Sequence, residues 1–525
     1  MFVECQGGRA CDPSRYLRHT AHRLSPQRNL IEKIAELFFI DNHWGWKMED
    51  AALVPEASSI RFEADSLGHV PVPASAYYGA QTARAIANFQ ISGIPIGHYP
   101  DLIRSLAYVK TAAASANFIL GDLSEDKKDA ILRACDEVAE GLFADQFVLD
   151  VFQGGAGTST NMNMNEVIAN RALEHLGLPR GRFDVIHPNN DVNLSQSTND
   201  VYPTAIRLSL VLSTRKLLDA LEYLSASFDR KAGEFGSIVK LGRTQLQDAV
   251  PMTLGQEFTA FAVTLREDMS RLTEAVGLFH EVNLGGTAIG TGITADPRYA
   301  STAISELATV SGVPLRPASD FVEACWDTGA FVLFSGTLKR TAVKISKICN
   351  DLRLLSSGPR GGFGEITLPP MQPGSSIMPG KVNPVIPEMV NQVAFQVIGS
   401  DLVVTMAAEG GQLQLNAFEP VIVFNLLQSI SLMTSAFRTL ADRCVAGIVA
   451  NEETCRQNLE AGTALATALT SLIGYEKAAE LAKQILSTGR TMRELLEEDS
   501  SLSSNLIEQA LEVKLLTQPI RLRRA

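Results

Sequence analysis

The chain has 525 residues, a net charge of −12 and an apolar fraction of 46% beside 20% charged residues. This length predicts two or three domains, and the apolar content excludes disorder as the main state. An acidic balance argues against nucleic-acid binding, and the chain has no run of 18 apolar residues that would predict a membrane span. We therefore expect a large globular protein with neither nucleic-acid nor membrane partners.

The cysteines are scattered and show neither CxxC nor Cys/His ligand spacing. Their number, 7, is odd, and their separation along the chain is wide. This pattern is typical of reduced, buried thiols in an intracellular protein. We expect a cytoplasmic location and no metal site; a divalent ion such as Mg²⁺ stays open as an activator, since no residue pattern tests it.

Residues 1–47 differ from the rest of the chain. They are rich in arginine and histidine, and residues 13–30 contain four arginines and no acid, as a transit peptide would. Acidic residues elsewhere in the segment spoil that pattern. Three interpretations remain: a start assigned too early, a disordered extension and a transit peptide. The acids favour the first two.

Long helical patterns dominate the middle of the chain. Four segments have apolar residues three or four positions apart, which is the spacing of one helix face. The stripes begin at Leu210, Phe258, Leu338 and Val390. Helices of this length are expected to pack almost parallel in a bundle and to associate between subunits. The glycine-rich segment 285–292 lacks the Gly-Lys-Ser/Thr ending of a phosphate loop, so we interpret it as a tight interruption between helices.

Residues after about 447 return to short helical patterns and end in a basic tail. We therefore expect four parts, which are the extension 1–47, an N-terminal domain 48–200, a central helical domain 201–446 and a small C-terminal helical domain 447–525.

Five polar blocks carry the candidate chemistry. They are GGAGTSTNMN at 154–163, QSTND at 196–200, GRTQLQDAVPMTLGQE at 242–257, GSSIMPGKVNP at 374–384 and QLQLNAFEP at 412–420. The block at 374–384 combines glycines and prolines with adjacent hydroxyls, the cation of Lys381 and the amide of Asn383. This inventory suits binding of a small carboxylate, and nearby positive charge would favour a serine alkoxide.

The five blocks, in this order and at this spacing, resemble the fumarase/aspartase superfamily, whose members eliminate across a Cα–Cβ bond to release fumarate. The resemblance runs from about residue 60 to the C-terminus. It implies an all-α, three-domain fold in which the central bundle of long helices forms the core of a homotetramer. It also implies active sites to which three subunits contribute.

The resemblance also implies roles for single residues. Ser375 matches the catalytic base. The hydroxyls expected to surround the carboxylate next to the carbanion are those of Thr158, Ser197, Thr198 and Ser376. Lys381 and Asn383 are expected to hold the other carboxylate. Residues able to orient an ammonium group are Asn199, Thr244 and Gln245. Glu388 matches a glutamate that supports position 245.

Gln245 discriminates between branches of the superfamily. Similar fumarases have a histidine there that shuttles a proton for a leaving hydroxide, and a glutamine cannot titrate. Ammonia leaves from a protonated amine and needs no such acid. Some aspartases also have this histidine, so Gln245 speaks against fumarase more than for aspartase. The blocks at 249–252 and 412–416 resemble aspartases.

We therefore expect conversion of L-aspartate to fumarate and ammonia. Two alternatives stay open, a class II fumarate hydratase acting on L-malate and an inactive relative with a structural or binding role.

Overall fold

The structure, a computed structural model, describes residues 60–498, 503–512 and 516–518. The expected extension 1–47 lies outside the described residues, so the structure tests none of its three interpretations. The described part is mostly helical, as the sequence predicted, and its strands pair only in twos.

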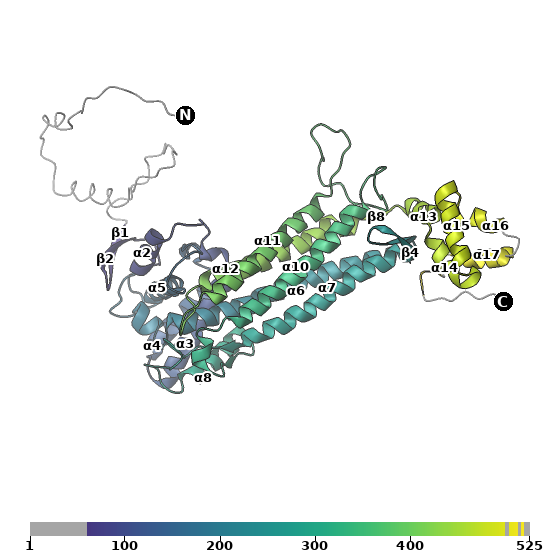
Figure 1. The fold of residues 1–525 in the computed structure, drawn as a ribbon. Coiled ribbons are helices and arrows are strands. Elements are labelled where there is room, and N and C mark those ends of the chain that lie inside the picture. Colours follow the sequence, from purple (N-terminus) through teal and green to yellow (C-terminus); the bar gives the residue numbers. More distant parts are fainter. Residues whose placement is uncertain (1–59, 499–502, 513–515, 519–525) are drawn as a thin grey trace, which may run out of the picture. The chain divides into compact units, whose positions relative to one another are not determined.

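The N-terminal part is a hairpin followed by helices that pack on one another (Figure 1). Its elements are β1 (Ile60–Asp65), β2 (Gly68–Pro73), α2 (Ala80–Asn88), η3 (Ile96–His98), α3 (Pro100–Leu120), α4 (Glu125–Ala139), η4 (Ala144–Gln146), α5 (Thr158–His175) and the π-helical turn η5 (Pro188–Val192). The carboxylate of Glu166 on α5 accepts the backbone N–H groups of Gly79, Gln81 and Thr82. It thereby satisfies the N-terminus of α2, which has no capping side chain of its own.

Five long helices form the bundle and run alongside one another in Figure 1. They are α6 (Thr198–Glu234), α7 (Leu254–Val276), α10 (Gly329–Leu355), α11 (Val385–Glu409) and α12 (Glu419–Arg443). The expected boundary at residues 200/201 falls inside α6, because the side chain of Ser197 caps that helix in a capping box with Asp200.

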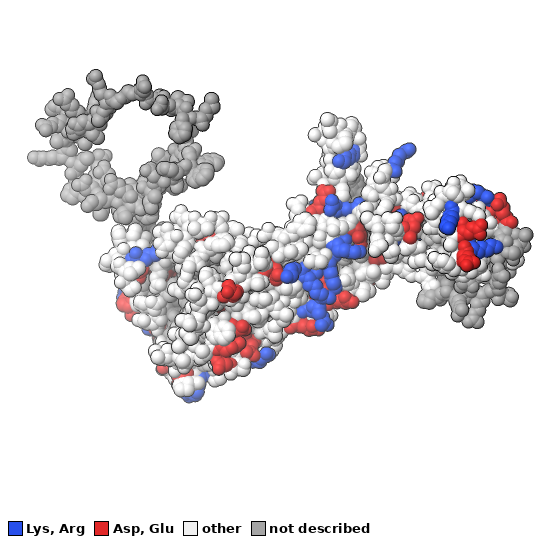
Figure 2. All heavy atoms as spheres, in the orientation of Figure 1, with Lys and Arg blue, Asp and Glu red and all other residues white. Residues whose placement is uncertain are grey.

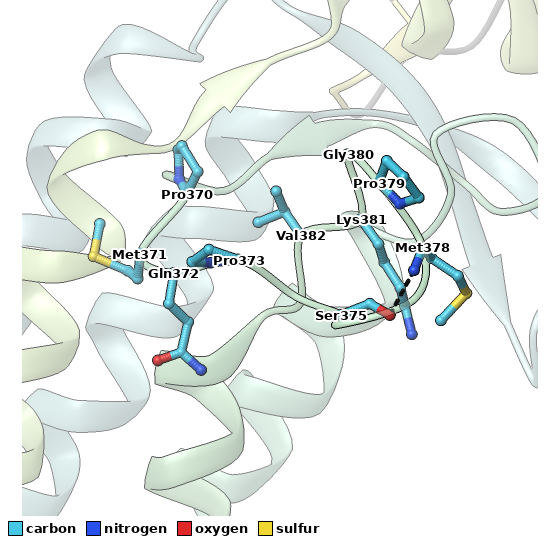
Figure 3. Close-up of a pocket in the computed structure, with 10 residues that line it drawn as sticks. All are labelled: Pro370, Met371, Gln372, Pro373, Ser375, Met378, Pro379, Gly380, Lys381 and Val382. Carbon is cyan, nitrogen blue, oxygen red and sulfur yellow. Dashed lines mark hydrogen bonds between the residues drawn. The ribbon is translucent and has the colours of Figure 1, made fainter.

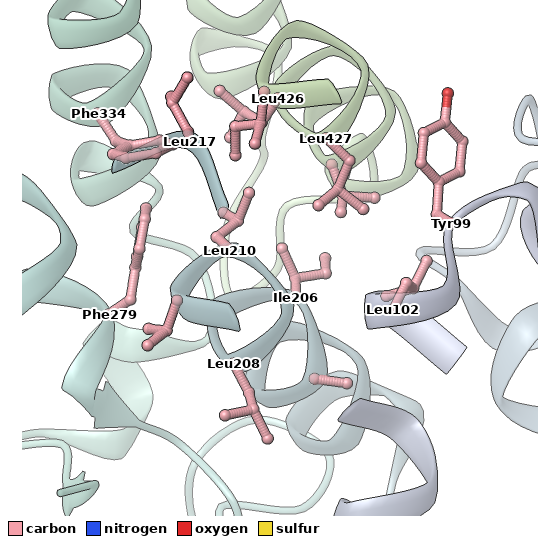
Figure 4. Close-up of a cluster of buried hydrophobic side chains, with 14 of the residues drawn as sticks. Tyr99, Leu102, Ile206, Leu208, Leu210, Leu217, Phe279, Phe334, Leu426 and Leu427 are labelled. Carbon is pink, nitrogen blue, oxygen red and sulfur yellow. The ribbon is translucent and has the colours of Figure 1, made fainter. Parts of the chain in front are cut away.

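The predicted apolar stripes are buried faces of these helices. On α7, Phe258, Leu265 and Leu272 are fully buried, while the last member of that stripe, Phe279, belongs to the 3₁₀ turn η6 (Gly277–His280). Figure 4 shows α6 near the centre of this core, with Leu210 and Leu217 among side chains from α10 and α12. The core therefore fixes the first half of α6, which begins at Thr198.

The remaining elements connect and follow the bundle. They are β3 (Val239–Thr244), β4 (Gln247–Thr253), β5 (Glu281–Val282), α8 (Tyr299–Ser311), β6 (Arg316–Pro317), α9 (Phe321–Ala324), β7 (Ile366–Thr367), η7 (Val445–Gly447), β8 (Val449–Ala450), α13 (Glu452–Ala461), α14 (Ala464–Ile473), α15 (Tyr475–Thr488), α16 (Met492–Glu497) and α17 (Ser504–Leu511). The short C-terminal helices are confirmed and have an apolar cluster of their own.

The glycine-rich segment 285–292 is a turn between β5 and α8, as interpreted from the sequence. Gly290 has φ +91°, and a Cβ there would lie 2.4 Å from the backbone of Phe321. Only glycine fits this close approach.

Two helices have the length and mean hydropathy that a membrane span also has. They are α11, and α12 taken through η7. The apolar window of α12 is 61% buried inside the bundle, whereas that of α11 is 33% buried.

On the face drawn in Figure 2, charged side chains of both signs are interspersed between broad uncharged areas.

Candidate active site

Residues 374–383, here called the Ser375 loop, lie between β7 and α11 and contain the expected base. Ser375 is partly buried, and its Oγ accepts hydrogen bonds from the backbone N–H groups of Ile377 at 3.1 Å and Met378 at 2.9 Å. Two donors directed at one hydroxyl oxygen stabilise negative charge on it. The geometry therefore favours the alkoxide that a serine base requires.

The neck of the Ser375 loop is closed by two hydrogen bonds. Gly374 donates its N–H to the Lys381 carbonyl at 2.8 Å, and the Asn383 side chain donates to the Gly374 carbonyl at 2.8 Å. A Cβ on Gly374 would lie 2.5 Å from the Lys381 carbonyl oxygen, so glycine is required there. Asn383 thus has a structural role that the sequence did not reveal.

The loop and the preceding residues 370–373 border an open hollow of about 500 Å³. Figure 3 shows Ser375 and Lys381 on one side of it, opposite Gln372. Ser376 and Lys381 are exposed, and Glu388 is partly buried in the first turn of α11. The structure therefore gathers five of the expected residues in one place, namely Ser375, Ser376, Lys381, Asn383 and Glu388.

A second group lies where α5 and α6 begin. Ser197 caps α6, Thr198 and Asn199 form its first turn, and Thr158 is the first residue of α5. Asn161, one turn into α5, donates to Thr198 Oγ1 at 3.1 Å and so joins the two helix starts. Backbone N–H groups at helix N-termini attract carboxylates, which suits the expected binding role.

Asn199 is fixed by hydrogen bonds that compensate for the effect of Pro203 on helix α6. Proline has no N–H to bond the carbonyl four residues earlier, so the Asn199 carbonyl lacks its helical partner. The Asn283 side chain supplies one at 3.0 Å, and the Asn199 side chain donates to the Ala288 carbonyl at 2.8 Å. The glycine-rich turn thus fixes a predicted site residue.

Two buried charges lie behind the start of α6. The fully buried carboxylate of Asp200 accepts from the backbone of Ser197, Gly285 and Thr287, and burial raises its pKa to about 6. Burial lowers the pKa of Lys110 to about 7, with Asp200 opposing that effect. Sequence reasoning missed Lys110, because its partners are more than 80 residues away.

The third group is the tip of the β3–β4 hairpin. Thr244 pairs with Gln247, so that Gln245 and Leu246 form a two-residue turn with φ of 54° and 62°. Both Thr244 and Gln245 are exposed. Turns of this type match the twist of a hairpin and present their central side chains outward.

A buried ion cluster holds this hairpin. Glu365 is fully buried and pairs with Lys240 at 2.9 Å and Arg243 at 2.7 Å, both on β3. Asn458 on α13 also donates to it, at 3.3 Å. The hairpin is therefore fixed to the segment that leads into the Ser375 loop.

The structure does not bring the three groups together in one chain. Helix α6 has 37 residues, so at about 1.5 Å per residue its ends are about 55 Å apart. Thr198 lies at one end, and the hairpin follows the other. Ser375 follows Glu365 by ten residues, which span at most about 36 Å, so the Ser375 loop also lies toward the hairpin end.

Two protein families together match most of this chain. Residues 68–399 match the family described as "Lyase", and residues 465–518 match the family described as "Fumarase C C-terminus".

Curated relatives are similar over nearly their whole length. Aspartate ammonia-lyase from Pseudomonas fluorescens is 59% identical over 469 residues, which is 89% of this chain and 98% of the relative. The protein of the same name from Pseudomonas canavaninivorans is 60% identical over 88% of this chain and 98% of its own. The one from Escherichia coli K12 is 50% identical over 88% and 97%.

Solved structures share the fold. A Brucella melitensis structure described as fumarate lyase:delta crystallin bound to cobalt has a TM-score of 0.86 and 60% identity, covering 88% of this chain and all of that one. A class II fumarase from Schistosoma mansoni has a TM-score of 0.83 and 36% identity, covering 87% and 99%.

Proposed function

We propose a function from the premise that this chain belongs to the fumarase/aspartase superfamily of lyases. It is a carbon–nitrogen lyase, an aspartate ammonia-lyase that converts L-aspartate into fumarate and ammonia. One observation carries the choice of branch: identity is 59–60% to two curated aspartate ammonia-lyases and 36% to the class II fumarase. Gln245 supplies a chemical reason, since it cannot assist a leaving hydroxide.

The chemistry begins with removal of a proton from Cβ. In the proposed reaction the Ser375 alkoxide takes this proton, and the electron pair of the C–H bond moves toward the adjacent carboxylate, which becomes a dianion. The C–N bond then breaks, and ammonia leaves from the protonated amine without help from an acid. The N–H donors of Ile377 and Met378 support the first step by stabilising the alkoxide.

Stabilising the dianion needs dense donors around one carboxylate. The α6 start offers the Ser197 and Thr198 hydroxyls, and Thr158 begins the neighbouring helix. Lys381 is exposed beside Ser375 and is suited to the second carboxylate. Asn199, Thr244 and Gln245 would orient the leaving ammonium group.

These residues can meet only between chains, because the α6 start and the Ser375 loop lie toward opposite ends of the bundle. We propose a homotetramer in which antiparallel neighbours bring those ends together. Helix α11 supports this proposal, because an apolar stripe of Phe395, Leu402 and Met406 is more than 60% exposed in a single chain. Such a stripe is typical of a helix that packs against another subunit.

The proposed reaction needs no resident cofactor, since a base and hydrogen-bond donors suffice. The described residues contain no group of three or more His, Cys, Asp and Glu that could hold a metal ion. The five described cysteines are buried and unpaired, which supports our proposal of a cytoplasmic location.

The test is to incubate the purified protein with L-aspartate and, separately, with L-malate, and to follow fumarate by its absorbance. We expect fumarate from L-aspartate, with L-malate at least about a hundredfold poorer in kcat/KM, because a site built for one polar group rejects its analogue. Comparable rates on the two substrates would instead support a fumarase. No rate on either would support an inactive relative.

A further inference from the structure

Lys110 is a fully buried lysine whose hydrogen-bond partners are neutral side-chain amides. It is 0% exposed on α3, and its Nζ donates to Asn193 Oδ1 at 2.9 Å and Gln196 Oε1 at 2.9 Å. Both acceptors belong to the segment that leads directly into Ser197–Asn199. Burying a lysine without an ion-pair partner is costly, so a gain elsewhere has to offset that cost.

The gain is a fixed orientation of the Asn193 side-chain amide. A lysine nitrogen donates hydrogen bonds to both partners, so the atom that Asn193 turns toward it must be the oxygen. A protonated Nζ can only donate and admits no other orientation, whereas a neutral Nζ also has a lone pair that can accept from an amide NH₂ group. The same oxygen accepts from Asn161 Nδ2 at 3.1 Å and Asn165 Nδ2 at 3.2 Å.

The orientation passes from Asn193 to Asn161. Because Asn193 presents an oxygen, Asn161 must present its NH₂ group, which also donates to Thr198 Oγ1 at 3.1 Å. The Oδ1 atom of Asn161 is buried without a hydrogen-bond partner. The amide therefore keeps this orientation although it leaves one of its own atoms unsatisfied.

The orientation of Asn161 determines which hydrogen bonds the Thr198 hydroxyl can make. Its oxygen already accepts from Asn161, so its own hydrogen is available for donation. Among the described residues, no hydrogen bond donated by Thr198 Oγ1 is present. We propose that Lys110 is a positioning residue that, through Asn193 and Asn161, fixes the Thr198 hydroxyl as a donor toward the substrate carboxylate.

This inference rests on the proposed function, in which Thr198 binds the carboxylate that gains charge. Without Lys110 the Asn193 amide keeps only the long bond of 3.3 Å from its Nδ2 to the Gln196 carbonyl to fix its orientation. The two amides can then rotate, and Thr198 can donate inward to an amide oxygen. It would then present lone pairs to the carboxylate, which repel it most strongly when the dianion forms.

A double-mutant cycle tests the relay. Lys110→Met removes the donor, Thr198→Val removes the hydroxyl, and both are combined in the tetrameric enzyme. Lys110→Met alone should lower kcat/KM for L-aspartate about 10- to 100-fold. In the Thr198→Val background the same change should cost less than about threefold, because no hydroxyl remains to orient.

A matched control separates this effect from lost packing. Lys231 is also a buried lysine, but it lies at the other end of α6 and donates to Glu234 and the Ile448 carbonyl. Lys231→Met should lower the melting temperature, and its effect on kcat/KM should be the same in the presence and absence of the Thr198 hydroxyl.

Additive losses for Lys110→Met and Thr198→Val would overturn the inference and leave Lys110 as a packing residue. If Lys110→Met does not assemble, Asn161→Leu replaces it, since leucine also removes the donor to Thr198, and the same coupling is expected. An inactive wild type would instead overturn the proposed function. Wild-type activity with an additive cycle would overturn the relay alone.

Discussion

The side-chain amide of Asn383 donates a hydrogen bond of 2.8 Å to the carbonyl oxygen of Gly374, nine residues earlier in the chain. Together with the bond from the Gly374 N–H to the Lys381 carbonyl, it closes the loop that carries Ser375. A residue expected to hold the substrate therefore also sets the shape of the loop. A substitution of Asn383 will therefore lower activity both through weaker substrate binding and through a change in the shape of the loop.

We predict that Asn383→Asp lowers kcat/KM about 100-fold or more and leaves the melting temperature unchanged. A carboxylate cannot donate to the Gly374 carbonyl, and it would repel the substrate as well. Steady-state kinetics and hydrogen exchange of residues 374–383 check this, with faster exchange expected. Asn451→Ala is the matched control, because Asn451 donates to the Gly364 carbonyl at 2.7 Å but should leave exchange in the Ser375 loop unaltered. Unchanged loop exchange in Asn383→Asp would show that the loop is held by other contacts.

Ser375→Ala should abolish turnover while the protein stays folded and keeps the oligomeric state of the wild type. The hydroxyl adds little to any core, and it is the only acceptor that the Ile377 and Met378 N–H groups share within the described structure. Ser376→Ala is the matched comparison and should cost about 100- to 1,000-fold, the usual effect of one lost donor. Both are read from fumarate formation at saturating L-aspartate. A Ser375→Ala rate within about tenfold of wild type would show that another residue takes the proton.

How far the sequence predicted the structure depends on the distance between interacting residues. The stripe on α7 follows a local period, so Phe258 and Leu272 were predicted to be buried, and they are. The stripe's end was less predictable, since Phe279 is placed by a 3₁₀ turn after Gly277. Lys110 gave no local signal, because its two partners come from a segment over 80 residues later.

The site shows the same division. Motifs named the candidate residues, but they did not reveal that Asn383 closes a loop or that Asn283 bonds the Asn199 carbonyl that Pro203 leaves free. Nor did they predict a two-residue turn at Gln245 and Leu246, since neither is a residue that favours positive φ. Each of these features depends on tertiary contacts or on strain that the surrounding fold holds in place.

Gln245→His should raise the rate on L-malate about tenfold or more, because it restores a group that can pass a proton to a leaving hydroxide. Histidine tolerates the positive φ of 54° at this position better than most residues, so the hairpin should stay intact. Fumarate absorbance with L-malate measures the effect. Gln247→His, two residues further along the exposed hairpin, is the control and should change nothing. An unaltered malate rate in Gln245→His would place the selectivity elsewhere.

Glu419→Gln should make the protein less sensitive to rising pH. Glu419 is fully buried at the start of α12, and burial raises its pKa from 4.5 to about 8, with Arg207 opposing. The folded chain therefore binds this proton more tightly than the unfolded chain, and the free energy of unfolding falls as pH rises across that window. Melting temperatures between about pH 5 and 9 should shift in favour of the variant by several degrees. The exposed Glu409→Gln is the control, and a pH-independent difference from wild type would contradict the prediction.

A chain that starts at Met48 should match the full chain in kcat/KM, melting temperature and oligomeric state. The Pseudomonas fluorescens relative aligns with 469 residues, or 89% of this chain, and that match covers 98% of the relative. The lyase family match begins at residue 68, and β1 begins at Ile60. Residues 1–47 also lack a long apolar stripe with which to join the bundle. Size-exclusion chromatography, thermal melting and the fumarate assay compare the two forms. A truncated chain that assembles differently from the full chain, or melts several degrees lower, would show that these residues pack on the enzyme and belong to its folded core.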